Sequence, residues 1–138
     1  MGLIMSKLTL KNARNDEISE LETEALVDTG CVYLCIPQRI QIQLKLDQLD
    51  TKVVTVATEQ QITVPYVGPI QVKFKNRSCI VGAIVMGDEV LLGAIPMEDM
   101  DVILIPNTQT IDVNPESPNI ACGKVKKIEH GLDQQIRT

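Results

Sequence analysis

The chain has 138 residues, of which 44% are hydrophobic and only 2% aromatic, and it carries a formal net charge of −5 at pH 7. This length fits one domain with a modest core, and the acidic balance argues against a nucleic-acid partner, which needs concentrated Lys and Arg. No apolar run reaches the roughly 20 residues that span a bilayer, and no secretory signal opens the sequence. We therefore expect no membrane association and a cytoplasmic location.

Short apolar segments separated by polar turns follow one another along the chain. We predict strands at residues 3–13, 17–27, 32–36, 69–75, 79–86, 90–93, 101–106, 109–113 and 120–129, and a hairpin over 52–65. The strand at 109–113 is expected to pair with that at 101–106. Pro37 and Pro96 favour the first turns of two short helices. Polar stretches at 12–16, 45–52 and 114–119 are interpreted as turns or loops. The pattern indicates one all-β domain, a sandwich or barrel, over residues 1–125, with a frayed tail over 126–138.

The chain contains four cysteines, at positions Cys31, Cys35, Cys79 and Cys122. They form no C-x-x-C pair and have no histidine-rich neighbourhood, so their spacing does not favour a zinc site. Disulfides are disfavoured in a reducing compartment. We interpret the cysteines as small buried thiols and expect neither a metal nor a cofactor.

The stretch from Ala25 to Cys31 places an aspartate directly after three apolar residues. An ionisable carboxylate at the end of a buried strand is costly unless it has partners or a task. Thr29 can donate a hydroxyl hydrogen bond, and Gly30 permits a sharp turn or the close approach of another chain. Asp28 is therefore the candidate catalytic residue. The alternative is an ordinary β-turn, in which Asp and Gly are favoured anyway.

Three parts in a fixed order carry a resemblance to a known family. They are Leu26–Gly30, the hairpin tip Ala57–Glu59, and the apolar strand Leu91–Gly93 followed by a helical turn. In these parts the chain resembles the retropepsin-like aspartic proteases, more narrowly their uncharacterised prokaryotic branch, over about residues 3–125. Cys31 stands where such proteins usually have Ala or Ser, and Glu59 stands where glycine is common.

The resemblance implies a closed, mostly β barrel in which one chain supplies half of an active site. A homodimer would bring two copies of Asp28 together on a two-fold axis. A carboxylate pair that shares one proton supplies both the base that activates water and the acid that protonates the leaving nitrogen. The implied activity is hydrolysis of peptide bonds, without a metal or cofactor.

The resemblance also assigns supporting roles to residues around Asp28. In the catalytic loop, Thr29 would lock the two loops across the axis and Gly30 would leave room for the substrate backbone. The flap residues Ala57, Thr58 and Glu59 would close over an extended peptide and pair with it as a strand. Packing from Leu91, Leu92 and Gly93 would support the loop. Viral members have an arginine after the late glycine; because this chain has Ala94 there, no arginine contact is implied.

Two alternatives remain open from the sequence. One is a catalytically inactive peptide-binding or scaffolding module that retains the protease fold. The other is a subunit of a larger assembly that never forms the symmetric pair. The acidic residues Glu98, Asp99 and Asp101 are interpreted as favouring a helix start and then facing water, rather than as a metal cluster.

Overall fold

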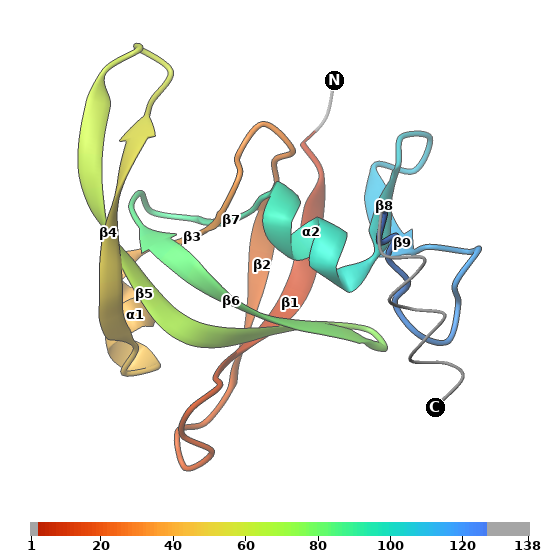
Figure 1. The fold of residues 1–138 in the computed structure, drawn as a ribbon, viewed down its shortest axis with the longest axis horizontal. Coiled ribbons are helices and arrows are strands. Elements are labelled where there is room, and N and C mark those ends of the chain that lie inside the picture. Colours follow the sequence, from red (N-terminus) through yellow and green to blue (C-terminus); the bar gives the residue numbers. More distant parts are fainter. Residues whose placement is uncertain (1–2, 127–138) are drawn as a thin grey trace.

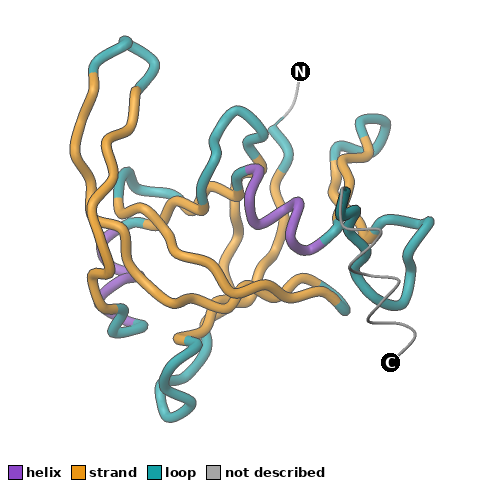
Figure 2. Tube along the Cα trace, viewed as in Figure 1, coloured by secondary structure: helices purple, strands orange, loops and turns teal. Residues whose placement is uncertain are grey.

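The computed structural model describes residues 3–126, and these form nine strands and two short helices (Figures 1 and 2). In chain order the elements are β1 (Met5–Asn12), β2 (Leu21–Val27), β3 (Leu34–Ile36), α1 (Gln38–Gln43), β4 (Asp47–Thr55), β5 (Gln61–Phe74), β6 (Arg77–Val85), β7 (Val90–Leu92), α2 (Ala94–Met100), β8 (Val102–Ile105) and β9 (Thr110–Val113). The helices have six and seven residues, and neither is long enough to cross a membrane.

Six strands close into a barrel, which confirms the predicted all-β class. The hydrogen-bonded order is β1-β2-β7-β3-β6-β5, and β5 pairs again with β1 through the register Leu10↔Val72. The pairs β2–β7 and β3–β6 are parallel, whereas the other barrel pairs are antiparallel. β4 lies outside this ring and extends the sheet beyond β5.

The barrel interior is filled by aliphatic side chains, because alternate residues of each strand point inward. In β1, Leu8 and Leu10 are fully buried, whereas Lys7, the residue before Leu8, is exposed. The largest fully buried side chains of the barrel and its helices include Leu8, Leu10, Leu34, Ile36, Leu44, Ile70, Val72, Leu92 and Met100. This composition is what a chain with almost no aromatic residues must use.

A buried amide joins the end of β1 to helix α1. The side-chain nitrogen of Asn12 donates hydrogen bonds to the carbonyls of Leu44 (2.9 Å) and Lys45 (3.2 Å), just beyond the helix. Helix ends leave carbonyls without intrahelical partners, and Asn12 satisfies two such groups. The helix predicted after Pro37 is confirmed. Asn12, which the sequence placed both at the end of the strand 3–13 and at the start of the polar turn 12–16, is the buried last residue of β1.

The prediction of a polar loop at 45–52 is wrong for most of that segment. From Asp47 onward it is part of the nine-residue strand β4, paired with β5 from Asp47↔Gly68 to Thr55↔Gln61. The first five residues of β4 are exposed, so they show no buried periodicity. Long-range pairing with β5 makes this segment a strand.

The second strand of the hairpin predicted over 52–65 and the strand predicted at 69–75 are one continuous strand, β5, of 14 residues. Two prolines, Pro65 and Pro69, lie within it, and proline usually interrupts a central strand. The register with β6 shifts between Val67 and Ile70, which accommodates the interruption. The first half of β5, up to Gly68, pairs with β4. The second half, from Ile70, pairs with β1 and closes the barrel.

The chain after α2 forms the two-stranded sheet β8–β9 and then a segment without regular structure. The strand predicted at 120–129 is wrong for residues 120–126, none of which is in a strand. The rest of that segment, and nearly all of the predicted frayed tail, lie outside the described residues. The pairing predicted between the strands at 101–106 and 109–113 is confirmed, because β8 and β9 pair antiparallel.

The carboxylate of Asp101 holds this last segment. Asp101 ends α2 in the left-handed conformation (φ 54°) and accepts hydrogen bonds from the Ser117 hydroxyl, the Asn114 side chain and the Cys122 backbone N–H. The nearby Arg77, which is 3% exposed, donates to the Ser117 carbonyl. These hydrogen bonds, that from Ser117 above all, lower the pKa of Asp101 to about 2.

The interpretation of the acidic residues at 98–101 needs correction. Glu98 and Asp99 are exposed as expected, but they stand in the second half of α2 and not at its start. Asp101 is not a freely solvated side chain: it is half-buried, and three donors bind its carboxylate.

Candidate active site

Asp28 follows β2 directly, in a tight loop with three defined backbone contacts. Its N–H donates to the Leu92 carbonyl (3.0 Å), and its own carbonyl accepts from the Cys31 N–H (3.1 Å). Its carboxylate oxygen Oδ1 accepts from the Gly30 N–H (3.0 Å). These contacts hold the carboxylate close to its own loop, and Asp28 is half-buried.

Strand order explains why Asp28 sits at this point. β2 lies between β1 and β7, with Ala25 opposite both Ser6 and Val90. The parallel register with β7 ends at Val27↔Leu92, so both strands stop together at the same end of the barrel. Asp28 is therefore the first residue after the last paired position, and its N–H still bonds to β7 next to the turn that leads into α2.

The turn from β7 into α2 touches the back of the Asp28 loop. A Cβ added to Gly93 would lie 2.2 Å from the Tyr33 carbonyl oxygen and 2.5 Å from the Cys31 carbonyl oxygen. The following N–H groups also bond to the loop: Ala94 donates to Cys31 (2.8 Å) and Ile95 to Val32 (2.9 Å). Glycine at position 93 is thus required by a backbone-to-backbone approach.

A groove of about 600 Å³ opens in front of Asp28. The loop and β3 form one wall, the β4 side of the hairpin forms the other, and Ile84, Met86 and Leu91 line it further. Most of this lining is apolar, and Asp28 is the only ionisable carboxylate among its lining residues in the described chain. A carboxylate in a largely apolar concave site is a typical functional arrangement.

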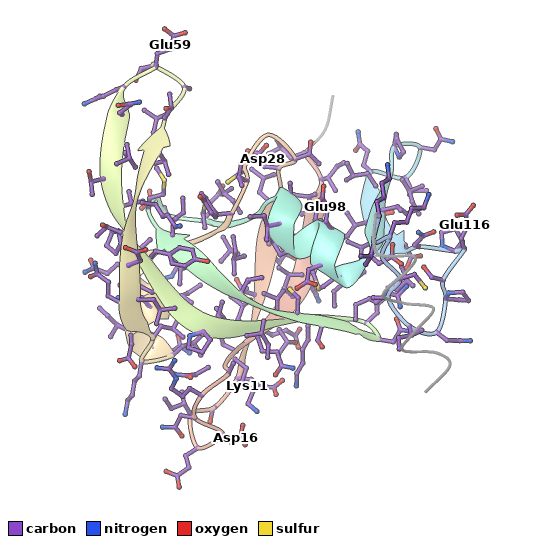
Figure 3. All side chains as sticks on the ribbon, in the orientation of Figure 1. Lys11, Asp16, Asp28, Glu59, Glu98 and Glu116 are labelled. Atoms are coloured by element: carbon purple, nitrogen blue, oxygen red, sulfur yellow. The ribbon has the colours of Figure 1, made fainter. Side chains whose placement is uncertain are left out.

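The β4–β5 hairpin extends well beyond the barrel, and its tip is exposed (Figure 1). Ala57 lines the groove, but Thr58 and Glu59 do not. Figure 3 shows Glu59 at the outer end of the hairpin, pointing away from the barrel. The tip is closed by hydrogen bonds between Val56 and Gln60 (3.0 Å) and from the Glu59 N–H to the Val56 carbonyl (2.8 Å).

Glu59 has a φ of 65°, in the left-handed region that favours glycine. An L-residue with a side chain pays a steric penalty there. The glycine that the resemblance leads one to expect at this position would therefore fit the local backbone better than Glu59 does.

The structure brings the predicted loop and the predicted support together. Asp28, Gly30, Ala57 and Leu91 all line the groove, and Leu92 and Gly93 contact the loop through their backbones. Thr29 is exposed, and its hydroxyl makes no hydrogen bond with any residue of 3–126. Thr29, Thr58 and Glu59 are therefore all exposed in this single chain.

Sequence reasoning missed several groove residues. Tyr33, Cys35, Ile84 and Met86 line the groove from strands that the sequence suggests only as core elements. The interpretation of four buried thiols is wrong for Cys122, which is exposed, and only partly right for Cys31, which is half-buried. Only long-range strand pairing places these residues at the groove, so no local pattern identifies them.

Searches for related proteins give no family assignment. No protein-family model and no curated protein matches this sequence.

Proposed function

We propose that the chain is a homodimeric aspartic endopeptidase of the retropepsin-like kind, with one Asp28 from each subunit. The observation that carries the proposal is the position of Asp28: it lines a largely apolar groove whose opposite wall is the β4 side of the long hairpin. The groove contains one such carboxylate per chain. A second copy would supply the other, because the pairing chemistry needs two.

In the proposed dimer, a water molecule lies between the two Asp28 carboxylates. Like charges a few ångströms apart do not readily coexist, so the pair shares one proton. The ionised member removes a proton from the water as it attacks the scissile carbonyl, and the protonated member supports the developing oxyanion. Proton transfer to the nitrogen then releases the two peptide products.

The hairpin would act as a flap over the substrate. An extended peptide in the groove can pair with main-chain groups of the hairpin, which would orient the scissile bond toward Asp28. Closure would also exclude bulk water from the carboxylates. The apolar lining from Val54, Ile84 and Leu91 would hold side chains of the peptide.

Exposed groups beside Asp28 would form the contact between subunits. Leu3, Val32 and Ile95 are 74%, 53% and 44% exposed, and all three are adjacent to the loop. The Ile4 carbonyl accepts from Val27 (2.8 Å), and the Ile95 N–H donates to the Val32 carbonyl (2.9 Å). The free Thr29 hydroxyl would then bond to the loop of the second subunit.

The second candidate is a peptide-binding module with the same fold and no turnover. It is favoured by the single groove carboxylate in one chain, since an unpaired Asp28 has no acid partner. Such a module would use the hairpin and groove for strand addition alone. The third candidate is a subunit of a larger assembly.

Peptide cleavage decides between the two main candidates. The purified chain is incubated with an unstructured protein substrate from acidic to neutral pH, and products are identified by mass spectrometry. The endopeptidase predicts internal cleavage that is lost in Asp28→Asn but kept in Asp88→Asn, a matched change on an exposed turn. Binding of peptide without cleavage by wild type, as a dimer, would favour the module.

A further inference from the structure

Two cysteine thiols lie against each other at the base of the groove. Cys31 follows Gly30 in the loop, Cys35 is the middle residue of β3, and their Sγ atoms are 3.3 Å apart. Both line the groove beside Asp28. The Cys31 thiol is half-buried and also reaches the Tyr33 carbonyl (3.3 Å), whereas Cys35 is 2% exposed.

We propose that Cys31 and Cys35 are a redox-active pair that closes reversibly to an intramolecular disulfide. A disulfide places its sulfur atoms about 2.0 Å apart, so closure needs only about 1.3 Å of approach from the observed separation. The two Sγ atoms are already in direct contact. The remaining movement is within the reach of a side-chain rotation and a small loop adjustment.

The oxidant is a low-molecular-weight disulfide such as glutathione disulfide. Cys31 gives its proton to water, and its thiolate attacks one sulfur of the oxidant, forming a mixed disulfide and expelling one thiolate. Cys35 then loses its proton and attacks the Cys31 sulfur, which expels the second thiolate. Two protein thiols are oxidised, one external disulfide is reduced to two thiols, and the released protons end on those thiols.

Exposure sets the order of the two cysteines. Cys31 is the partly accessible member, so it meets the oxidant first. Burial raises the pKa of Cys35, and its contact with Cys31 acts in the same direction. Cys35 therefore stays protonated until the mixed disulfide has formed on Cys31. It then resolves this mixed disulfide by intramolecular attack.

Formation of the disulfide would affect the Asp28 loop, because both the N–H and the carbonyl of Cys31 take part in backbone hydrogen bonds. Its N–H donates to the Asp28 carbonyl (3.1 Å), and its carbonyl accepts from Ala94 (2.8 Å). Drawing the Cys31 sulfur toward β3 must strain or shift these contacts. The consequence for cleavage rests on the proposed function, whereas formation of the disulfide does not.

The two other cysteines provide internal controls. The Cys79 thiol contacts the Pro96 carbonyl at 3.9 Å, and Cys122 contacts the Ile120 carbonyl at 3.6 Å. Within residues 3–126, neither has a cysteine sulfur within hydrogen-bond distance. Cys122, being exposed, is expected to take up glutathione as a stable mixed disulfide.

The test is oxidation of the full chain with glutathione disulfide, followed by alkylation, trypsin and mass spectrometry. Trypsin yields one peptide, residues 15–39, that contains both Cys31 and Cys35. We expect this peptide to lose two hydrogens, to resist alkylation, and to recover both thiols with dithiothreitol. A double variant Cys79→Ala/Cys122→Ala should behave identically, and Cys31→Ser or Cys35→Ser should abolish closure.

Two results would overturn the proposal. One is a peptide 15–39 that keeps both thiols while Cys122 is glutathionylated; the other is a stable glutathione adduct on Cys31 that Cys35 never resolves. The wild-type peptide map answers this even if Cys35→Ser fails to fold. Asp28→Asn should still form the disulfide, so failure of the protease proposal leaves this test intact.

Activity gives the separate readout for coupling to Asp28. If wild type cleaves peptide, the oxidised form should be about tenfold to a hundredfold slower, since displacement of about 1 Å has effects of that size. Dithiothreitol should restore the rate. Unchanged cleavage in fully oxidised protein would overturn the coupling while leaving the disulfide established.

Discussion

The backbone N–H of Asp28 donates a 3.0 Å hydrogen bond to the carbonyl of Leu92, two residues that are 64 positions apart in the chain. This bond continues the parallel pairing of β2 and β7 by one step beyond the ladder. It fixes where the carboxylate leaves the barrel. Gly93 follows at once and presses its backbone against the same loop.

Gly93→Ala should destabilise the protein. The new Cβ would lie 2.2 Å from the Tyr33 carbonyl oxygen, a backbone atom that cannot rotate away. We expect a loss of about 1–3 kcal/mol in the free energy of unfolding, measured by urea denaturation. Gly123→Ala, where the added Cβ has no neighbour within 4 Å, should stay within about 0.5 kcal/mol of wild type. Equal effects in the two variants would contradict the close approach.

Val32→Asp and Ile95→Asp should weaken the proposed dimer. Each would place a carboxylate in an apolar contact beside the two-fold axis, where it would lie close to its symmetry mate. We expect the dissociation constant to rise about a hundredfold, measured by analytical ultracentrifugation. Ile42→Asp, a matched change at a side chain 67% exposed on α1, should leave it unchanged. A wild type that is monomeric at high concentration would refute the dimer itself.

Glu59→Gly should stabilise the hairpin tip. Without a side chain, the left-handed backbone at φ 65° is no longer sterically unfavourable. Glycine also adds conformational entropy to the unfolded chain, so we expect the free energy of unfolding to rise by only about 0.5–1 kcal/mol. Glu59→Ala keeps a Cβ and should show no such gain. Chemical denaturation measures both. A loss of stability in Glu59→Gly would mean that the Glu59 side chain stabilises the tip.

Acid should release the segment held by Asp101. Its pKa is lowered from 3.8 to about 2, chiefly by the Ser117 hydroxyl, so its stabilising effect is present above the unfolded value and is lost as pH falls through the folded one. Limited proteolysis after Pro106 should therefore increase across that interval. Ser117→Ala should shift the onset to higher pH, and Asp101→Asn should remove this step. An identical profile in Asp101→Asn would contradict the assignment.

The sequence was sufficient for the features that depend on local pattern. Alternating Leu8 and Leu10 in β1 predict a half-buried strand, and an aspartate after Val27 predicts a polar residue at a strand end. The support of the loop by Leu92 and Gly93, in contrast, was implied by the family resemblance and not by local pattern. The strand β1 and the polar strand end at Asp28 each lie within a few residues of the signal that reveals them.

Features made by distant pairing could not be predicted in this way. β4 is exposed and polar at its start, so only its partner β5 makes it a strand. Cys35 comes to the groove from β3 and Met86 from the residue just after β6. The contact between Cys31 and Cys35 depends on the fold of the loop between them. The carboxylate of Asp101 finds its donors 13 to 21 residues later, in a segment without regular structure.

The central claim is that one Asp28 is half of a site, and mixed dimers test it most directly. Wild-type chain at fixed concentration is mixed with increasing Asp28→Asn chain, and the rate of peptide cleavage is followed after subunit exchange. We predict that the rate falls toward zero as mixed dimers replace wild-type dimers, whereas added Asp88→Asn chain causes no fall. A rate that stays constant with excess Asp28→Asn, while mixed dimers form, would contradict the claim.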